Sequence, residues 1–189
     1  MHIRNAKLPD CADLAILDDI AGHGLTSHVW AIAAKGAGTA SAFEFGRDTY
    51  RSHDTPCNWT NARIAEQDGE LAGMAVGYRL PEDSDFSRPI HPLFAPVYRL
   101  FAKATGSWLL DALAVYSGYR RSGIARALLD DQISRAGAQP FYVVCADENE
   151  AALALYKSRN FRAVADETRE AFDPGTAAGR WLLLQRDQS

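Results

Sequence analysis

Residues 119–126 combine side chains that suit the binding of a phosphate group. An apolar run typical of a buried strand precedes them, and a helical pattern follows. The first N–H groups of a helix have no partner inside the helix, and the helix dipole favours negative charge there. Small residues in such a turn let a diphosphate approach those N–H groups closely. The turn contains three small residues and three arginines: Ser122, Gly123, Ala125, Arg120, Arg121 and Arg126.

The same segment has a simpler interpretation. A surface loop with one glycine and several solvated arginines would have this composition. The residues of the turn alone do not distinguish an anion site from such a loop, so the flanking sequence has to decide.

Apolar periodicity predicts the elements that must position this turn. A strand over 107–116 enters it, and apolar residues at helical intervals predict a helix over 124–136 after it. Asp68-Gly69 predicts a two-residue turn between two further strands, at 61–67 and 70–78. Other strands are expected at 1–5, 141–146, 161–172 and 180–186, and other helices from Pro9, within 21–60, over 97–104 and from Asp147 or Asn149 to 158.

This order of strands and helices is mixed α/β. No internal repeat, low-complexity tract or linker interrupts the chain, so we expect a single domain over residues 1–189. Prolines break up the first part of residues 79–106, which we interpret as an insertion. The insertion either shapes the acceptor side of a binding site or, through its apolar positions, makes a contact between two copies in a homodimer.

The composition argues against several classes of function. Of the 189 residues, 47% are hydrophobic and 23% are charged, as in an ordinary globular protein. The net charge of -4 argues against a nucleic-acid partner, which a basic face would indicate. The cysteines and histidines show no metal-ligand spacing, so we expect no metal. No signal peptide and no apolar run of ~20 residues is present, so we expect a cytoplasmic protein without a membrane partner.

Two motifs, in this order, resemble those of the GNAT superfamily of acetyltransferases. The acetyl-CoA loop of that family has the pattern R/Q-x-x-G-x-G/A, and residues 120–125 read R-x-x-G-x-A after the lead-in L-A-V at 113–115. Residues 149–156 read N-x-x-A-x-x-L-Y, which is similar to the family's second signature. The family usually has glycine before the phenylalanine at 161, where this chain has Asn160. The resemblance is weakest in 21–60 and 79–106, the regions that would shape the acceptor side.

The resemblance implies a fold, a cofactor and a set of contacts. The fold is a mixed, mainly antiparallel central sheet of about seven strands with helices on both faces, as in acyl-CoA N-acyltransferases. The acetyl donor is acetyl-CoA, the acceptor is an amine, and no metal takes part. The implied cofactor-binding residues are Leu113, Ala114, Val115, Arg120, Arg121, Ser122, Gly123, Ile124, Ala125, Arg126, Asn149 and Tyr156.

Two residues are candidates for catalysis. The family places a tyrosine at the position of Tyr156, where its phenol gives a proton to the CoA sulfur; a packing residue at a helix end is the alternative. Asp111 lies on the strand that enters the loop, where some family members carry a catalytic base; an Asp paired with an arginine or at the sheet surface is the alternative.

The expected function is therefore an acetyl-CoA-dependent N-acetyltransferase that acts on a primary amine of a small molecule or a peptide. A regulatory module that keeps the fold and binds acyl-CoA without turnover is the competing interpretation. The residues around Leu113 would limit the length of the acyl chain. The identity of the amine does not follow from the sequence.

Overall fold

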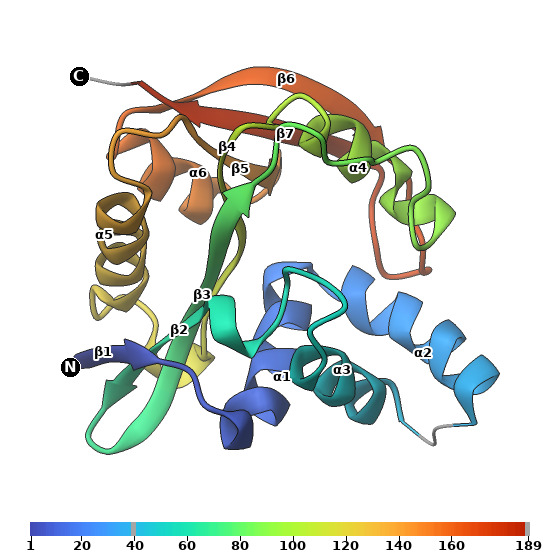
Figure 1. Cartoon of the computed structure of the whole chain (residues 1–189), viewed down its shortest axis with the longest axis horizontal. Coiled ribbons are helices and arrows are strands. Elements are labelled where there is room, and N and C mark those ends of the chain that lie inside the picture. The colour runs from blue at the N-terminus through green and yellow to red at the C-terminus, as the bar shows by residue number, and fades with distance from the viewer. Residues whose placement is uncertain (39–40, 188–189) are drawn as a thin grey trace. The chain divides into compact units, whose positions relative to one another are not determined.

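A computed structural model describes residues 1–38 and 41–187 (Figure 1). Within these residues the strands form an open, mixed sheet in the order β1-β2-β3-β4-β5-β7-β6, which confirms the predicted fold class. Strands β4 and β5 are parallel, whereas β1 pairs with β2, β2 with β3, β5 with β7 and β6 with β7 antiparallel. The strands are β1 (His2–Asn5), β2 (Ala62–Gln67), β3 (Glu70–Leu80), β4 (Ser107–Val115), β5 (Phe141–Ala146), β6 (Phe161–Arg169) and β7 (Gly179–Arg186).

The described residues also form six α-helices and four short 3-10 helices. The α-helices are α1 (Cys11–Ala21), α2 (Leu25–Ala37), α3 (Ala42–Arg51), α4 (Ala95–Phe101), α5 (Ile124–Ala136) and α6 (Glu150–Lys157). The 3-10 helices are η1 (Leu8–Asp10), η2 (Trp59–Asn61), η3 (Pro92–Phe94) and η4 (Ser117–Tyr119). The predicted helix over 124–136 and strand over 141–146 have these same bounds, and residues 21–60 hold two helices.

The chain divides into two compact units. The first comprises Met1–Tyr78 with Asp111–Arg135, and the second comprises Arg79–Leu110 with Ala136–Ser189. The boundary therefore falls inside β3 and β4. That the whole chain acts as one domain stays a prediction.

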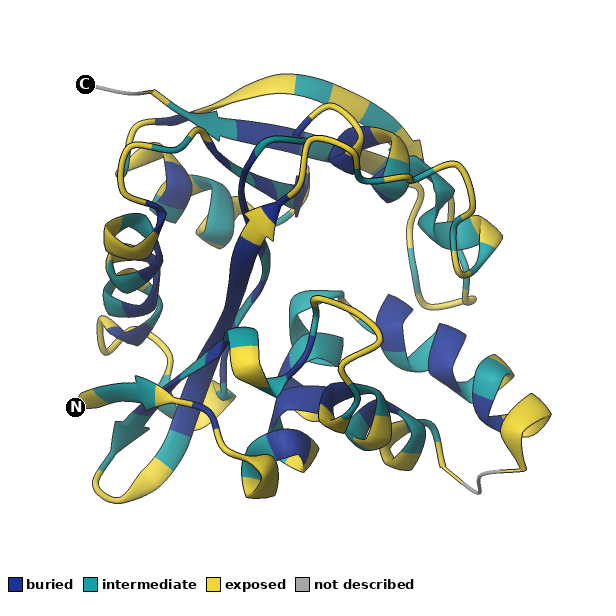
Figure 2. Ribbon diagram, viewed as in Figure 1, coloured by how far each residue is buried: buried dark blue, intermediate teal, exposed yellow. Residues whose placement is uncertain are grey.

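In the first unit, helices cover both faces of the hairpin formed by β2 and β3. Asp68 and Gly69 join the strands with φ angles of 55° and 85°, as a two-residue hairpin turn requires. Helices α5 and α1 lie on opposite sides of the hairpin in Figure 1. Figure 2 shows β3 buried along most of its length, which fits a strand that is covered on both faces.

One ion pair fixes the helix that follows the predicted anion-binding turn. The Arg63 guanidinium on β2 donates from Nε and Nη2 to the two carboxylate oxygens of Asp131 on α5, each at 3.0 Å. Such a bidentate pair sets direction as well as distance. The axis of α5, and with it the direction of the N–H groups at its first turn, is therefore tied to the sheet.

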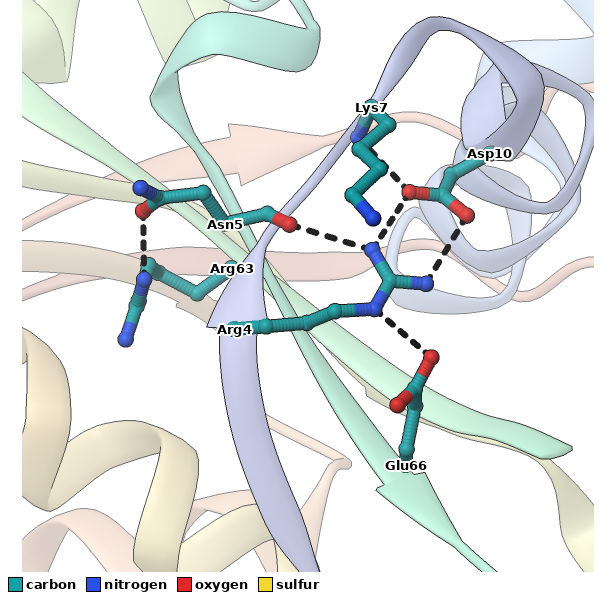
Figure 3. Close-up of polar contacts among 6 residues, drawn as sticks. All are labelled: Arg4, Asn5, Lys7, Asp10, Arg63 and Glu66. Atoms are coloured by element: carbon teal, nitrogen blue, oxygen red, sulfur yellow. Dashed lines mark hydrogen bonds and ion pairs between the residues drawn. The ribbon is translucent and has the colours of Figure 1, made fainter. Parts of the chain in front are cut away.

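A second ion network holds the first strand to the first helix (Figure 3). Arg4 on β1 donates to both oxygens of Asp10, at 2.7 and 3.0 Å, and to Glu66 on β2 at 2.6 Å. Burial alone would raise the pKa of Asp10, but the hydrogen bonds from Arg4 and from the Lys7 N–H outweigh it and lower this pKa. The ionised carboxyl of Asp10 therefore contributes to stability.

Replacing Arg4 by Met is expected to lower the free energy of unfolding at pH 7 by about 1–2 kcal/mol, because Asp10 loses its cation. A carboxyl group whose pKa is lower in the native than in the unfolded state stabilises the fold at pH values above its unfolded pKa, and this effect is lost as pH falls through the native pKa. The difference in unfolding free energy between wild type and Arg4→Met should therefore shrink below about pH 4. Urea unfolding over a pH series measures this. Arg47→Met is the control, because its partners Glu44 and Asp48 are exposed. An equal loss in both variants would contradict the expectation.

The second unit holds the insertion and the last three strands. Helix α4 lies in the insertion, and its Val97, Leu100 and Phe101 are buried within the chain itself. Phe101 also packs against Phe86 with ring centroids 5.8 Å apart. These apolar side chains therefore pack inside the second unit. A homodimer formed through the insertion stays a prediction.

Candidate functional site

The predicted anion-binding turn lies between the end of β4 and the start of α5. Arg121 and Gly123 have φ angles of 64° and 88°, in the left-handed region that favours glycine. The first helical hydrogen bond runs from the Ala127 N–H to the Gly123 carbonyl at 3.0 Å. The N–H groups of residues 123–126 therefore precede the helical ladder, at the positive end of the helix dipole.

The side chains of the turn leave this end of the helix accessible. A Cβ added at Gly123 would meet no described heavy atom within 4 Å. Ser122 is exposed, and its hydroxyl donates to the Tyr119 carbonyl rather than across the turn. Arg121 and Arg126 are exposed as well, so the first helical turn and the residues before it carry two accessible cations. An exposed helix N-terminus of this kind favours a negatively charged group, and that acetyl-CoA binds here stays a prediction.

Three hydrogen bonds hold the turn to its surroundings. The Tyr116 hydroxyl donates to Asp13 on α1 at 2.7 Å, and the Tyr119 hydroxyl donates to Glu70 on β3 at 2.6 Å. Arg120 donates from Nε to the Val115 carbonyl at 3.3 Å, which turns this arginine back toward the strand. The two phenols thus tie the turn to helix α1 and to strand β3.

Strand β4 comes unusually close to β3 where it enters the turn. A Cβ at Gly73 would lie 2.7 Å from the Ala114 carbonyl oxygen, so only glycine fits there. The Tyr116 N–H bonds to the Ala72 carbonyl at 2.9 Å. Ala114 and Val115 are buried and Leu113 is partly buried.

Asp111 lies on the same strand, beside residues that sequence reasoning did not select. The Tyr78 hydroxyl on β3 donates to Asp111 Oδ2 at 2.9 Å, and the Cys57 thiol acts on the pKa of this carboxyl. Burial raises the pKa of Asp111, and Tyr78, followed by Cys57, opposes that rise. The alternative of an Asp paired with an arginine is not what the structure shows.

The charge of Asp111 also acts on a second carboxyl group, that of Asp18 on helix α1. Burial raises the pKa of Asp18 to about 8, and the charge of Asp111 adds to the shift, whereas a hydrogen bond from Tyr50 opposes it. The Tyr50 hydroxyl also lies 3.3 Å from Cys57 Sγ. Two carboxyls, two phenols and a thiol thus gather around the middle of β4, and such perturbed groups are typical of functional sites.

A profile of the acetyltransferase (GNAT) family matches residues 24–161, most of the described chain. The protein belongs to this family. The turn at 120–125 and the segment 149–156 both fall inside the match. Family and fold therefore agree with each other.

Solved GNAT structures share the fold at low sequence identity. An N-acetyltransferase from Staphylococcus aureus is 16% identical with a TM-score of 0.63, over 98% of this chain and 100% of that one. A ribosomal-protein-alanine N-acetyltransferase from Brucella melitensis is 19% identical with a TM-score of 0.57, over 98% and 99% of the chains. A Chaetomium thermophilum protein solved in complex with a bisubstrate analogue is 17% identical with a TM-score of 0.61, over 98% and 86%.

A curated relative matches only part of the chain. An uncharacterized protein from Mycobacterium leprae is 28% identical over 95 residues, which make up 50% of this chain and 26% of the relative. The chain thus spans 26% of the length of the relative that it matches.

The second GNAT signature lies in the other compact unit. Asn149 is the N-cap of α6, where its side-chain oxygen accepts from the Ala152 N–H at 3.1 Å. Tyr156 on the same helix is buried, with its ring 5.6 Å from that of Phe161. Burial, followed by the charge of Cys145, raises the pKa of Tyr156, so its phenol keeps its proton at neutral pH.

Two further searches covered the described residues. In 1–38 and 41–187, no group of three or more His, Cys, Asp or Glu side chains is placed to hold a metal ion. Over the same residues, none of the helices combines the length and apolar character that crossing a membrane requires.

Proposed function

We propose that the protein is an acetyl-CoA-dependent N-acetyltransferase that acetylates a primary amine by direct attack of the nitrogen. The observation that carries the proposal is the left-handed turn at Gly123, which opens directly into the N-terminus of a helix of 13 residues. Backbone N–H groups at such an end favour the diphosphate of a CoA thioester. The exposed Arg121 and Arg126 supply the charge that balances its phosphates.

The residues of the first unit fit this donor. Gly123 leaves space where a Cβ would stand, and Ala125 keeps the first helical turn small. The backbone of Leu113 and Val115, on the strand that leads to the turn, is proposed to bond the pantetheine arm. When bound, acetyl-CoA supplies a thioester whose carbonyl carbon accepts the nitrogen of the amine.

Asp111 is proposed to be the general base. A primary amine has a pKa of ~10.4 and is protonated at neutral pH, so one N–H bond must break before the nitrogen can attack. Asp111 takes that proton and forms an O–H bond. Tyr78 and Cys57, which act on the Asp111 carboxyl, are neutral groups, so an incoming ammonium brings a charge opposite to that of Asp111.

Tyr156 is proposed to complete the proton balance. The nitrogen loses a second proton when the amide forms, and the CoA sulfur gains one when its bond to carbon breaks. The raised pKa of the buried phenol keeps a proton on Tyr156 that it can give to the sulfur. The second proton from the nitrogen passes through solvent to Tyr156 and restores its phenol, and the proton on Asp111 leaves to water, so the net products are the amide, CoA thiol and one proton.

We further propose that the protein works in the cytoplasm. Cys11, Cys57 and Cys145 are free thiols in the structure, and free thiols are typical of a reducing compartment.

Calorimetry with acetyl-CoA, followed by an amine panel read by mass spectrometry, tests the proposal. We expect saturable acetyl-CoA binding that weakens with added salt, and an increase of one acetyl group on at least one primary amine together with free CoA. Binding without any acetylated product would favour the regulatory module that binds acyl-CoA without turnover. Absence of binding would overturn both.

A further inference from the structure

We infer that Tyr78 is the positioning residue of the proposed base: its hydroxyl holds Oδ2 of Asp111, so that Oδ1 takes the proton of the amine. The inference deepens the proposed function and rests on it for its catalytic meaning. The hydrogen bond itself is a property of the free protein, so it can be tested without a substrate.

A hydrogen bond between side chains links two neighbouring strands at the proposed base. The Tyr78 hydroxyl donates to Asp111 Oδ2 at 2.9 Å, within the ordinary range for such a bond. Tyr78 lies on β3 and Asp111 on β4, which are adjacent in the sheet, and both residues belong to the first compact unit. Because the bond reaches one of the two carboxylate oxygens, it restricts the rotation of the carboxyl group.

The two bonded side chains differ in their access to solvent. Tyr78 is 8% exposed, so its ring is packed and its hydroxyl has little freedom to move. Asp111 is partly exposed, although its neighbours in the strand, Leu110 and Ala112, are buried. A packed phenol therefore holds a carboxyl group that remains open to solvent.

Strand β4 is accessible at two positions, and they share a face. Within Ser107–Val115, Asp111 and Leu113 are the two residues that are not fully buried. Side chains two positions apart in a strand point to the same face of the sheet. The backbone of Leu113 is proposed to bond the pantetheine arm. Asp111 therefore opens on the face of β4 that Leu113 shares, beside the proposed path of the acetyl donor.

The phenol also favours the charged form of the carboxyl group. A donor stabilises a carboxylate more than a carboxylic acid, so Tyr78 lowers the pKa of Asp111, which burial raises, and Cys57 does so to a smaller extent. The charge of Asp111 in turn acts on Asp18 of α1, on Tyr50 of α3 and on Cys57, which precedes η2. These three groups bring no positive charge to Asp111, so Tyr78 is the main group that keeps it ionised.

Carbon-13 NMR of the carboxyl carbons, recorded against pH on the free protein, tests the hydrogen bond. We expect the resonance that disappears in Asp111→Asn to titrate at higher pH in Tyr78→Phe than in the wild type. Phenylalanine keeps the packed ring and removes only the donor. An unchanged titration of Asp111 in Tyr78→Phe would overturn the inference.

A second measurement does not depend on the folding of a variant. In the wild type, the Cζ carbon of Tyr78 should shift with the same midpoint as the Asp111 carboxyl carbon, because the hydroxyl loses a charged acceptor when that carboxyl is protonated. Two different midpoints would contradict the inference.

Tyr142→Phe is the matched control. Tyr142 also lies on a strand, β5, and is partly buried, but it belongs to the other compact unit. Loss of its hydroxyl should change neither the titration of Asp111 nor the activity, and melting temperatures show whether both variants are folded. If Tyr142→Phe moves the titration as far as Tyr78→Phe does, the hydrogen bond is not the cause and the inference is wrong.

Steady-state kinetics separates positioning from packing. Tyr78→Phe should lower kcat/KM for the amine about threefold to tenfold at pH 7 and leave KM for acetyl-CoA unchanged, because the turn at Gly123 is not altered. The loss should grow toward acidic pH, because Asp111 of the variant is already protonated at a higher pH. An equal loss at every pH, or none, would overturn the catalytic part of the inference. If the wild type acetylates no amine, the proposed function fails, and the NMR titration still decides whether Tyr78 holds Asp111.

Discussion

Replacing Asp111 by Asn is expected to lower kcat/KM by about 10²–10³-fold and to leave the affinity for acetyl-CoA unchanged. The Asn side chain has the same shape and still accepts the hydrogen bond from Tyr78, which is 2.9 Å long in the wild type. It cannot take a proton from an ammonium group. The turn at Gly123, which is proposed to bind acetyl-CoA, is unchanged in this variant. The single substitution therefore tests the chemical step separately from acetyl-CoA binding.

The loss of kcat/KM in Asp111→Asn should depend on pH. Without a base the enzyme relies on the small fraction of amine that is already neutral, and this fraction grows as pH approaches the amine pKa of ~10.4. Steady-state kinetics of both proteins between pH 6 and 10, on an amine acetylated by the wild type, should therefore show the two rates converging at the alkaline end. A loss below threefold at pH 7, with the fold intact, would exclude Asp111 as the base.

The Gly123→Ala variant is expected to bind acetyl-CoA about tenfold to a hundredfold more weakly. Its φ of 88° is unfavourable for any residue with a Cβ, so the turn must change or bear strain. The added methyl group also occupies the open space next to the N–H groups that are proposed to hold the diphosphate. Calorimetry with acetyl-CoA and with free CoA measures the loss, which should be similar for both ligands.

Two glycines in the same compact unit serve as controls. Gly69 has a φ of 85° and also meets no described atom at its Cβ position, but it lies in the β2–β3 turn. Gly69→Ala should therefore lower the melting temperature as Gly123→Ala does, without an effect on binding. Gly118→Ala, in η4, should change neither. If Gly123→Ala and the wild type bind acetyl-CoA with equal affinity, acetyl-CoA does not bind at this turn.

The local sequence predicted much of the fold and the turn at Gly123. The helix over Ile124–Ala136 and the strand over Phe141–Ala146 have strong apolar periodicity, and their bounds agree with the structure. A small-residue turn between a strand and a helix is also a local feature, because the residues that shape it are neighbours in the chain. The region 21–60 was harder to interpret because aromatic and glycine residues interrupt its periodicity, and packing such as that of Trp30 against Gly46 completes its helices.

The sequence by itself determined the family, the order of the elements and the turn at Gly123, because each depends on residues close together in the chain. Only the tertiary structure decided what surrounds each carboxyl group. Asp18 and Asp19 are adjacent and chemically identical, yet Asp19 accepts the Ser27 N–H at 2.8 Å while Tyr50 and the charge of Asp111 act on Asp18. That difference arises from the direction in which each side chain leaves helix α1, and it has physical meaning only once helix α3 has packed beside that helix.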